Sequence, residues 1–367
     1  MNTARPSERR HSNRALWTIL VVLLLGASLA AVGAAEVGLR LLQSRKYGSA
    51  TTVEQQYTLD KRIDLRVPIA NLRLGRIETN SLGFRGPEIR MPKPPGTVRI
   101  AFLGASTTWC AEVSGNANAW PHLVAQDLQR AFANSDVDYV NGGVPGYTLK
   151  SSLKNLEYRV APLQPDIIVI YHATNDMSAE LRRLAAERGL IGGGRVAASW
   201  LSDKSLLWNL AEKNFRIWIA QRKAEKELDR LQVDSATLGA AFRADLIQLV
   251  RRAQQEARIV AVATFSARLR SEQSDEEQLQ AAASALYYMP FMTPRGLLGS
   301  YAQYNRIIRE VARETGALLI EGENDIPGDA QHFTDSVHFT DAGSRAMAVR
   351  VSSALVQSAP VKAIFGQ

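Results

Sequence analysis

Two residues near the C-terminus, Asp335 and His338, have the types and spacing of an acid–base pair. They lie in the stretch FTDSVHFTD, residues 333–341, where the carboxylate and the imidazole stand three positions apart just before an amphipathic pattern. An aspartate held beside a histidine can fix the tautomer of the imidazole and stabilise its cation. The histidine can then act as a general base near neutral pH. Such a pair requires a nucleophile from elsewhere in the chain.

A serine nucleophile is predicted at Ser106, which follows the apolar run 98–103 after Gly104 and Ala105. A serine directly after a strand can expose its hydroxyl at the edge of a sheet. A helix that begins just beyond it favours the negative charge that develops there. Because Gly-x-Ser after a strand is also common in ordinary turns, this motif is weak alone and gains weight only from its neighbours in space.

The elements that must position these residues form a predicted α/β domain. Five apolar runs alternate with segments of helical periodicity, which predicts a three-layer α/β/α sandwich with a mostly parallel five-stranded sheet. In such sheets ligands bind at the carboxyl ends of the strands. The predicted strands are 98–103, 137–140, 166–171, 258–264 and 318–320, and the predicted helices are 120–132, 149–160, 243–256, 302–315 and 342–355.

Two further segments that follow predicted strands offer hydrogen-bond donors. The glycines of Asn141-Gly142-Gly143, after the second strand, let backbone N–H groups approach a ligand closely. Asn175, after the third strand, carries a side-chain amide that can donate to an oxyanion. Together with Ser106, Asp335 and His338, these donors are predicted to converge on one edge of the sheet, which is more specific than any single motif.

These segments resemble the sequence blocks of the SGNH/GDSL hydrolases, specifically the membrane-anchored bacterial type with an N-terminal neck. The resemblance covers residues 75–357, with the blocks in the order and spacing of the family. Ala105 stands where many members have Asp, and Ala173 replaces the Gly of the family's Gly-x-Asn-Asp block, so the substrate class is left open while every reacting group is kept. The similar segments are 104–106, 141–143, 173–176, 335–338 and, in the neck, 80–86.

The resemblance implies a serine hydrolase that acts on ester bonds, with no cofactor and no metal. Carried over by position, Ser106 is the nucleophile, His338 is the general base and later the general acid, and Asp335 holds His338. The implied oxyanion hole consists of the N–H groups of Ser106 and Gly143 and the side chain of Asn175. The α/β-hydrolases share the order Ser, Asp, His, but their Gly-x-Ser-x-Gly motif does not fit a chain with threonine at position 108.

Two other interpretations of the C-terminal stretch stay open at this point. In the first, Asp335 is a helix cap and His338 a core histidine. In the second, His332, Asp335 and His338 bind a metal, with His172 and Asp176 completing the shell, since His and Asp are adequate zinc ligands. A metal site would leave the serine and the oxyanion donors without roles.

The N-terminal residues predict a membrane anchor. Residues 15–35 carry no charge, and as a helix they span roughly 31 Å, enough for a bilayer core. The arginines before this segment favour a cytoplasmic N-terminus. A cleaved signal peptide competes with this interpretation, but no clean Ala-x-Ala site precedes Glu36. The expected location is therefore the bacterial inner membrane, with a single pass and a periplasmic catalytic domain.

The predicted domain division follows from this anchor and from the later change in pattern. It consists of a cytoplasmic basic tail (1–14), a transmembrane anchor (15–35), a juxtamembrane neck (36–95) and an SGNH hydrolase-like domain (96–360) with a helical insertion at about 177–240. Apolar residues of the insertion, among them Trp200, Trp208 and Trp218, fall mostly at helical spacing. This spacing predicts core packing of a lid-like insertion, and a surface that faces substrate or membrane is the alternative.

Composition excludes several classes of protein. With 46% hydrophobic and 22% charged residues, the chain is of globular type. Of the formal net charge of +8, the first fifty residues contribute +5, from seven basic and two acidic residues, so +3 remains for the rest. This balance gives no case for a nucleic-acid groove. Cys110 is the single cysteine, which excludes an intrachain disulfide, and it is predicted to be a packed free thiol.

The predicted function is hydrolysis of an O-acyl ester, foremost an O-acetyl ester on an envelope or extracellular carbohydrate, that is, polysaccharide deacetylation. Lipid and thioester substrates stay open. One alternative is an O-acetyltransferase with the same triad. The other is a catalytically silent, membrane-tethered protein that binds carbohydrate or assists assembly. The sequence gives no oligomeric state.

Overall fold

The computed structural model describes residues 6–47, 56–191, 199–202, 204–224, 230–231 and 233–366. The chain divides into two compact units, Met1–Ala50 with Ala197–Asn214, and Thr51–Val196 with Phe215–Gln367. Each unit is described by itself.

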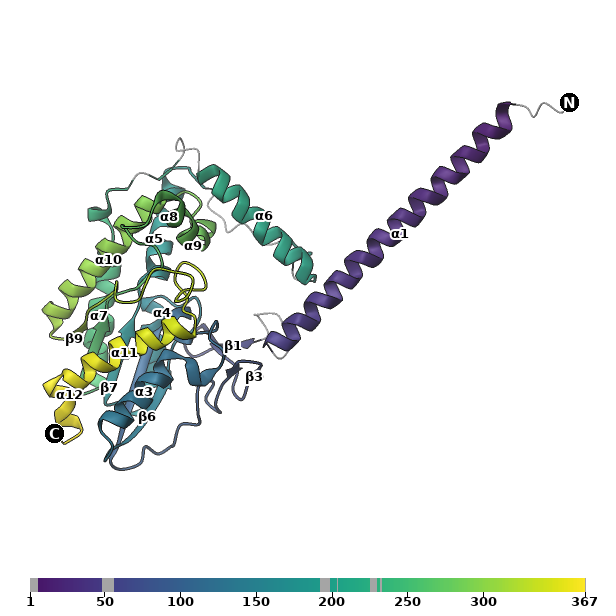
Figure 1. Ribbon diagram of the computed structural model, residues 1–367. Coiled ribbons are helices and arrows are strands. Elements are labelled where there is room, and N and C mark those ends of the chain that lie inside the picture. The colour runs from purple at the N-terminus through teal and green to yellow at the C-terminus, as the bar shows by residue number, and fades with distance from the viewer. Residues whose placement is uncertain are drawn as a thin grey trace. The chain divides into compact units, whose positions relative to one another are not determined.

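A parallel sheet of five strands forms the centre of the second unit (Figure 1). Its strands, in the order β6-β5-β7-β8-β9, have the positions that the apolar runs predict. β5 and β7 are buried at every position, because helices cover both faces of a parallel sheet. The predicted fold class is thereby confirmed. The strands are β5 (Thr97–Gly104), β6 (Asp136–Asn141), β7 (Ile167–Tyr171), β8 (Ile259–Ala263) and β9 (Leu318–Ile320).

The register of the central strands aligns their carboxyl ends. Phe102 of β5 pairs with Asn141, the last residue of β6, and Gly104 pairs with Tyr171, the last residue of β7. The segments that follow these three strands therefore leave the sheet at the same edge.

Two groups of helices flank the sheet: α3 packs against α11, and α4 and α10 each pack against α7. α10 begins at Pro294 rather than at the predicted residue 302, because Thr293 caps the helix by accepting a hydrogen bond from the Gly296 N–H. The predicted helix 149–160 ends as α4 at Asn155 and continues as irregular helical turns to Leu163. The helices of this unit are α2 (Ser106–Trp109), α3 (Trp120–Ala131), α4 (Leu149–Asn155), α5 (Thr174–Glu187), α7 (Ala240–Glu256), α8 (Asp275–Ala281), α9 (Ala283–Tyr288), α10 (Pro294–Thr315), α11 (Asp341–Gln357) and α12 (Ala359–Ile364).

The residues that precede the sheet form two short antiparallel hairpins. The first pairs β1 (Tyr57–Asp60) with β2 (Leu65–Pro68), and the second pairs β3 (Arg73–Leu74) with β4 (Ile77–Glu78). These hairpins belong to the same compact unit as the sheet.

The first unit is built around the helix α1 (Pro6–Tyr47). Within it, Trp17–Leu42 has a mean hydropathy of 2.4 and none of its most apolar window is buried, so this segment is long and apolar enough to cross a membrane. The predicted anchor 15–35 lies inside α1.

The helix α6 (Leu206–Ala224) and the residues before it contradict the prediction of core packing for this part of the chain. Trp200 is 67% exposed and Phe215 is 59% exposed, and Trp208 and Trp218 are also exposed. The prediction fails because helical spacing shows that apolar residues share a face, but not what that face contacts.

Candidate active site

The turn between β5 and α2 presents Ser106. β5 ends at Gly104, and Ser106 is the first residue of α2. A Cβ atom at Gly104 would clash with the Thr108 side chain and lie 2.9 Å from Tyr171 O, so this close packing requires glycine. Because Ser106 opens the helix, its backbone N–H has no acceptor within the helix and can face a ligand.

The loop between β9 and α11 brings His338 to Ser106. His338 Nε2 lies 2.8 Å from Ser106 Oγ, and His338 Nδ1 lies 2.8 Å from Asp335 Oδ2. The second carboxylate oxygen, Asp335 Oδ1, accepts the backbone N–H groups of Val337 and His338, each at 2.9 Å. The three side chains therefore form one continuous chain of hydrogen bonds, in the connectivity nucleophile, base and orienter.

This loop is held from both sides. The buried Ser336 Oγ accepts the Ala285 N–H at 3.1 Å and receives a hydrogen bond from Ser284 Oγ at 2.9 Å. Phe333 and Phe339 pair across the base of the loop, with ring centroids 5.2 Å apart. The imidazole is thus carried by a short, closed loop, which limits its movement relative to Ser106.

The electrostatics of the pair favour an ionised Asp335. Burial favours the neutral carboxyl, but the hydrogen bond and charge of His338 and two backbone N–H groups outweigh burial and lower the pKa of Asp335 from its ordinary value. A carboxylate at this position keeps a proton on His338 Nδ1. The lone pair of Nε2 then faces the Ser106 hydroxyl.

The loop after β6 packs tightly on α2. A Cβ atom at Gly143 would lie 2.7 Å from the Trp109 backbone nitrogen, so only glycine allows this approach. Asn141 bridges the two segments: its Nδ2 donates to Thr108 O at 3.0 Å, and its Oδ1 accepts the Gly143 N–H at 3.0 Å. The single N–H of Gly143 is therefore already used, and it can meet an oxyanion only by sharing its hydrogen between two acceptors.

Asn175 lies in the first turn of α5. Its Nδ2 donates to Tyr147 O at 2.9 Å. Since an amide nitrogen carries two hydrogens, this bond orients the amide and leaves its second N–H for another acceptor.

The family of the protein follows from a comparison of its sequence with those of known families. Residues 102–346 match the GDSL-like lipase/acylhydrolase family. The chain belongs to that family. The predicted resemblance is therefore confirmed, and the protein is a serine hydrolase that acts on ester bonds.

Solved structures resemble this GDSL-like acylhydrolase at low sequence identity. An acetylxylan esterase, Axe2 from Geobacillus stearothermophilus, is 16% identical, with a TM-score of 0.43 over 72% of this chain and 95% of that one. A lipase/acylhydrolase from Enterococcus faecalis is 18% identical, with a TM-score of 0.42 over 71% of this chain and 95% of that one. A search of the curated proteins finds no match.

Glu112 is a residue near the triad of this acylhydrolase that the sequence analysis missed. Burial raises the pKa of Glu112. The charge of His338 lowers this pKa, and the charge of Asp335 raises it further. Its Oε2 is buried and has no hydrogen-bond partner among the described residues. The only signal that marks Glu112 is this burial, which a sequence does not reveal.

A second serine, histidine and aspartate of the acylhydrolase lie together but do not make a reactive triad. His172 Nε2 lies 2.7 Å from Ser152 Oγ, whereas His172 Nδ1 lies 3.9 Å from Asp176 Oδ2, which is too long for a hydrogen bond. Ser152 is fully buried, so its hydroxyl cannot meet a substrate. Burial also lowers the pKa of His172 to about 3, which keeps the imidazole neutral. These residues brace α4 against α5.

The raised pKa of Asp176 predicts how the stability of the fold depends on pH. Burial raises its pKa to about 7, whereas an unfolded aspartate titrates near 3.9. The folded state therefore holds a proton that the unfolded state releases, so stability falls as pH rises from about 4 to about 7. Asp176→Asn keeps an acceptor for the Leu149 N–H and removes this penalty. We expect the variant to unfold at a higher temperature than the native protein at pH 8, with a smaller gain at pH 5.

Thermal unfolding at the two pH values checks this prediction. The exposed Asp64 provides the matched control, and Asp64→Asn should change the unfolding temperature equally at pH 5 and pH 8. An equal shift for Asp176→Asn at both pH values would contradict a raised pKa at Asp176.

The residues considered as metal ligands do not lie around a common point. His332 Nδ1 lies 2.8 Å from Asp329 Oδ1 rather than near Asp335. In the part of the chain that the structure describes, no group of three His, Cys, Asp or Glu side chains is placed to hold a metal ion. Cys110 is buried, and burial raises the pKa of its thiol to about 12, so it is a packed thiol rather than a nucleophile.

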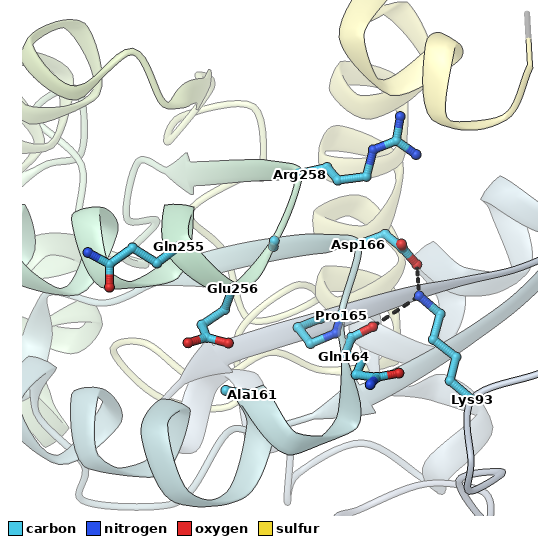
Figure 2. A pocket seen from close by; sticks show the side chains of 9 residues that line it. Lys93, Ala161, Gln164, Pro165, Asp166, Gln255, Glu256 and Arg258 are labelled. Carbon is cyan, nitrogen blue, oxygen red and sulfur yellow. Dashed lines mark hydrogen bonds and ion pairs between the residues drawn. The ribbon is translucent and has the colours of Figure 1, made fainter.

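A hollow open to solvent lies away from the triad (Figure 2). Its lining includes Asp166 and Arg258, which directly precede β7 and β8, so it lies at the amino ends of these strands. Lys93 Nζ pairs with Asp166 and also donates to Gln164 O at 3.0 Å. Lys93 and Asp166 satisfy each other's charge at this edge, and ligands of such sheets bind at the opposite edge.

Proposed function

We propose that this acylhydrolase removes O-acyl groups, foremost O-acetyl groups, from an envelope or extracellular carbohydrate, with Ser106, His338 and Asp335 as its catalytic triad. The observation that carries the proposal is the hydrogen-bond chain from Ser106 Oγ through both nitrogens of His338 to Asp335 Oδ2. The carbohydrate class is supported by the resemblance of the chain to the membrane-anchored bacterial type of SGNH hydrolase.

The reaction has two steps. Ser106 Oγ attacks the ester carbonyl carbon while His338 Nε2 takes the hydroxyl proton, and Asp335 stabilises the resulting imidazolium. The tetrahedral intermediate collapses to acyl-Ser106, and His338 gives the proton to the departing alcohol. Water then attacks the acyl carbon, again with His338 as base. The carboxylic acid leaves and the Ser106 hydroxyl is restored.

The oxyanion of each tetrahedral intermediate needs hydrogen-bond donors. We assign the backbone N–H of Ser106 and the second amide N–H of Asn175, with the Gly143 N–H sharing its hydrogen between Asn141 Oδ1 and the oxyanion. Such donors act in a preorganised way, because they need not reorient when charge develops.

Asn175→Ala is expected to lower kcat by ~10²–10³-fold, since one donor of this kind contributes that factor. The hydrolysis of an aryl acetate measures kcat, and circular dichroism establishes that the fold is retained. The exposed Asn214 on α6 gives the matched control, and Asn214→Ala should keep the native rate. A native kcat in Asn175→Ala would remove this side chain from the oxyanion hole.

The substrate class is tested with the purified full-length protein. Acetylated xylo-oligosaccharides, a phospholipid and an aryl acetate are each incubated with it, and the released acid is measured. Faster release from the sugar than from the lipid is the expected result. Faster release from the lipid would overturn the carbohydrate class, and transfer of the acetyl group to an added sugar instead of water would overturn hydrolysis.

We further propose that α1 anchors the protein in a bacterial inner membrane, with the catalytic domain in the periplasm. The segment Trp17–Leu42 supports this proposal by its length and hydropathy. Retention in the membrane pellet after an alkaline carbonate wash, with an intact N-terminus, is expected. A soluble protein that begins after residue 35 would instead establish a cleaved signal peptide.

A further inference from the structure

The segment around the start of α6 exposes large aromatic side chains. Trp200 is 67% exposed and Trp208 is 47% exposed, and Leu210 is also exposed. Along α6, Phe215 and Trp218 follow Trp208 at intervals of seven and three residues. This spacing places the three rings of Trp208, Phe215 and Trp218, called here the aromatic stripe, on one side of the helix.

The start of α6 is joined to α1. Glu36 Oε1 accepts the Leu206 N–H at 3.0 Å, and Oε2 accepts the Leu207 N–H and the Ser205 hydroxyl, each at 2.9 Å. Arg40 Nη2 donates to Lys204 O at 2.9 Å. A carboxylate that caps a helix in this way fixes the first turn of α6 to one level along α1.

That level lies directly after the uncharged stretch 15–35 of α1. A bilayer core takes about 20 helical residues, and counted from Trp17 this length ends near Glu36. A membrane that α1 crosses would therefore have its headgroup layer where α6 begins.

The composition of α6 suits that layer. Tryptophan is enriched at membrane interfaces, because its ring is apolar and its N–H is polar. The segment 199–223 carries five basic residues against two acidic residues, Asp203 and Glu212. Glu212 accepts hydrogen bonds from Ser199 and Ser202 within the segment. An aromatic and basic helix of this kind typically lies on the surface of an anionic bilayer.

We propose that residues 199–223 bind a phospholipid surface, with the aromatic stripe in the headgroup layer of the bilayer that α1 crosses. This inference rests on the proposed membrane anchor.

The six tryptophans of the chain provide the test. Trp109 and Trp120 are fully buried and give an unquenched baseline, and Trp17→Phe removes the tryptophan of α1. Full-length protein with Trp17→Phe is placed in vesicles of phosphatidylcholine and phosphatidylglycerol brominated near the headgroup. A loss of tryptophan fluorescence is expected. The loss should disappear when Trp200, Trp208 and Trp218 are also changed to phenylalanine.

Failure of this inference and failure of the anchor give different results. A protein that floats with the vesicles but is not quenched in the Trp17→Phe variant would be anchored, with the aromatic stripe in water, and the inference would be wrong. Quenching that an acetylated oligosaccharide relieves would identify the stripe as a sugar surface, and cross-linking between stripes of two copies would identify a dimer contact. A protein that does not float would overturn the anchor itself.

A second and independent inference concerns Arg85 in the neck. Its guanidinium is almost fully buried and donates to the carbonyl oxygens of Trp109, at 2.7 Å, and Cys110. It also donates to Asn116 Oδ1 at 2.8 Å and to Arg76 O at 3.2 Å. One side chain of the neck thus holds four acceptors, three of them in residues 109–116.

The neck turn that carries Arg85 is itself rigid. Asn80 Oδ1 accepts the N–H groups of Leu82 and Phe84, each at 3.0 Å, and its Nδ2 donates to Pro87 O at 2.9 Å. Gly83 has a φ of 77°, and a Cβ there would lie 2.5 Å from Pro68 O. The conformation of the segment 80–86 is therefore fixed by contacts within the neck.

The acceptors of Arg85 show that the neck turn is bonded to the end of α2. Trp109 ends α2, and Ser106 begins it. Because α2 is a single turn, a shift of its last carbonyl moves its first residue as well. We infer that Arg85 is a positioning residue that keeps Ser106 Oγ aligned with His338 Nε2.

Arg85→Lys tests this role, since lysine keeps the charge but cannot reach several carbonyls with a planar fork. We expect kcat per active site, counted by fluorophosphonate titration, to fall by ~10–10²-fold, because small displacements of reacting groups have effects of this size. KM for an aryl acetate should stay within twofold. Refilling of the site by added guanidinium in Arg85→Ala should restore part of the rate.

The matched control is Arg99→Lys. Arg99 is also fully buried and donates to the carbonyl oxygens of Arg90 and Leu163, but it lies in β5 away from α2. Both variants are expected to unfold at a lower temperature, and only Arg85→Lys should lose kcat per active site. Equal losses of stability with native kcat per active site in both would reduce Arg85 to a structural role.

Discussion

Replacement of Ser106 by alanine is expected to lower kcat for ester hydrolysis by ~10⁶-fold, the size of effect that loss of a nucleophilic serine produces. Ser106 Oγ lies 2.8 Å from His338 Nε2, and the neighbouring hydroxyls of Thr107 and Thr108 are buried. Neither threonine can therefore take its place. The rate with an aryl acetate and the labelling by a fluorophosphonate probe measure the effect, and both should vanish.

The matched control is Ser152→Ala, which removes a second serine that is hydrogen-bonded to a histidine. Because Ser152 is fully buried, its loss should lower the unfolding temperature while labelling persists. Labelling that survives in Ser106→Ala and disappears in Ser152→Ala would move the nucleophile to Ser152.

The residues that lie around Ser106 could be placed together from the sequence because each lies in a short segment at the end of a predicted strand or before a predicted helix. Ser106 follows β5, Asn175 follows β7 and the Asp335–His338 stretch precedes α11. Local sequence patterns identify the ends of buried parallel strands, and parallel topology then requires those ends to meet at one edge. The distances between these side chains come only from the structure, for example the 2.8 Å between Ser106 Oγ and His338 Nε2.

Other features depend on contacts that are distant in the sequence. The burial of Glu112 and the four acceptors of Arg85 arise only when the neck packs on α2. The Gly143 N–H is engaged by Asn141 two residues earlier, which the glycine motif does not reveal. The exposed face of α6 also could not be predicted, since the same apolar spacing suits a core, a sugar surface and a bilayer.

Asp335→Asn is expected to lower kcat by ~10⁴-fold with little change in KM, the effect found when a triad aspartate becomes an amide. The geometry of the loop gives the reason. The oxygen at the Oδ1 position must still accept the N–H groups of Val337 and His338, so the new NH₂ group faces His338 Nδ1. The imidazole then carries its proton on Nε2, where it cannot accept the proton of Ser106.

The chain contains its own control for this prediction. Asp329 and His332 have the same Asp-x-x-His spacing, and His332 Nδ1 lies 2.8 Å from Asp329 Oδ1. Since His332 is not near Ser106, Asp329→Asn should keep the native kcat. Nitrogen NMR of the histidines should show a change of tautomer at His338 in Asp335→Asn and none at His332 in Asp329→Asn, because His332 Nδ1 bonds the same oxygen, Asp329 Oδ1, that accepts the backbone N–H groups. A native kcat in Asp335→Asn together with the changed tautomer would mean that His338 is not the base, because a neutral Nε2–H imidazole cannot accept the proton of Ser106.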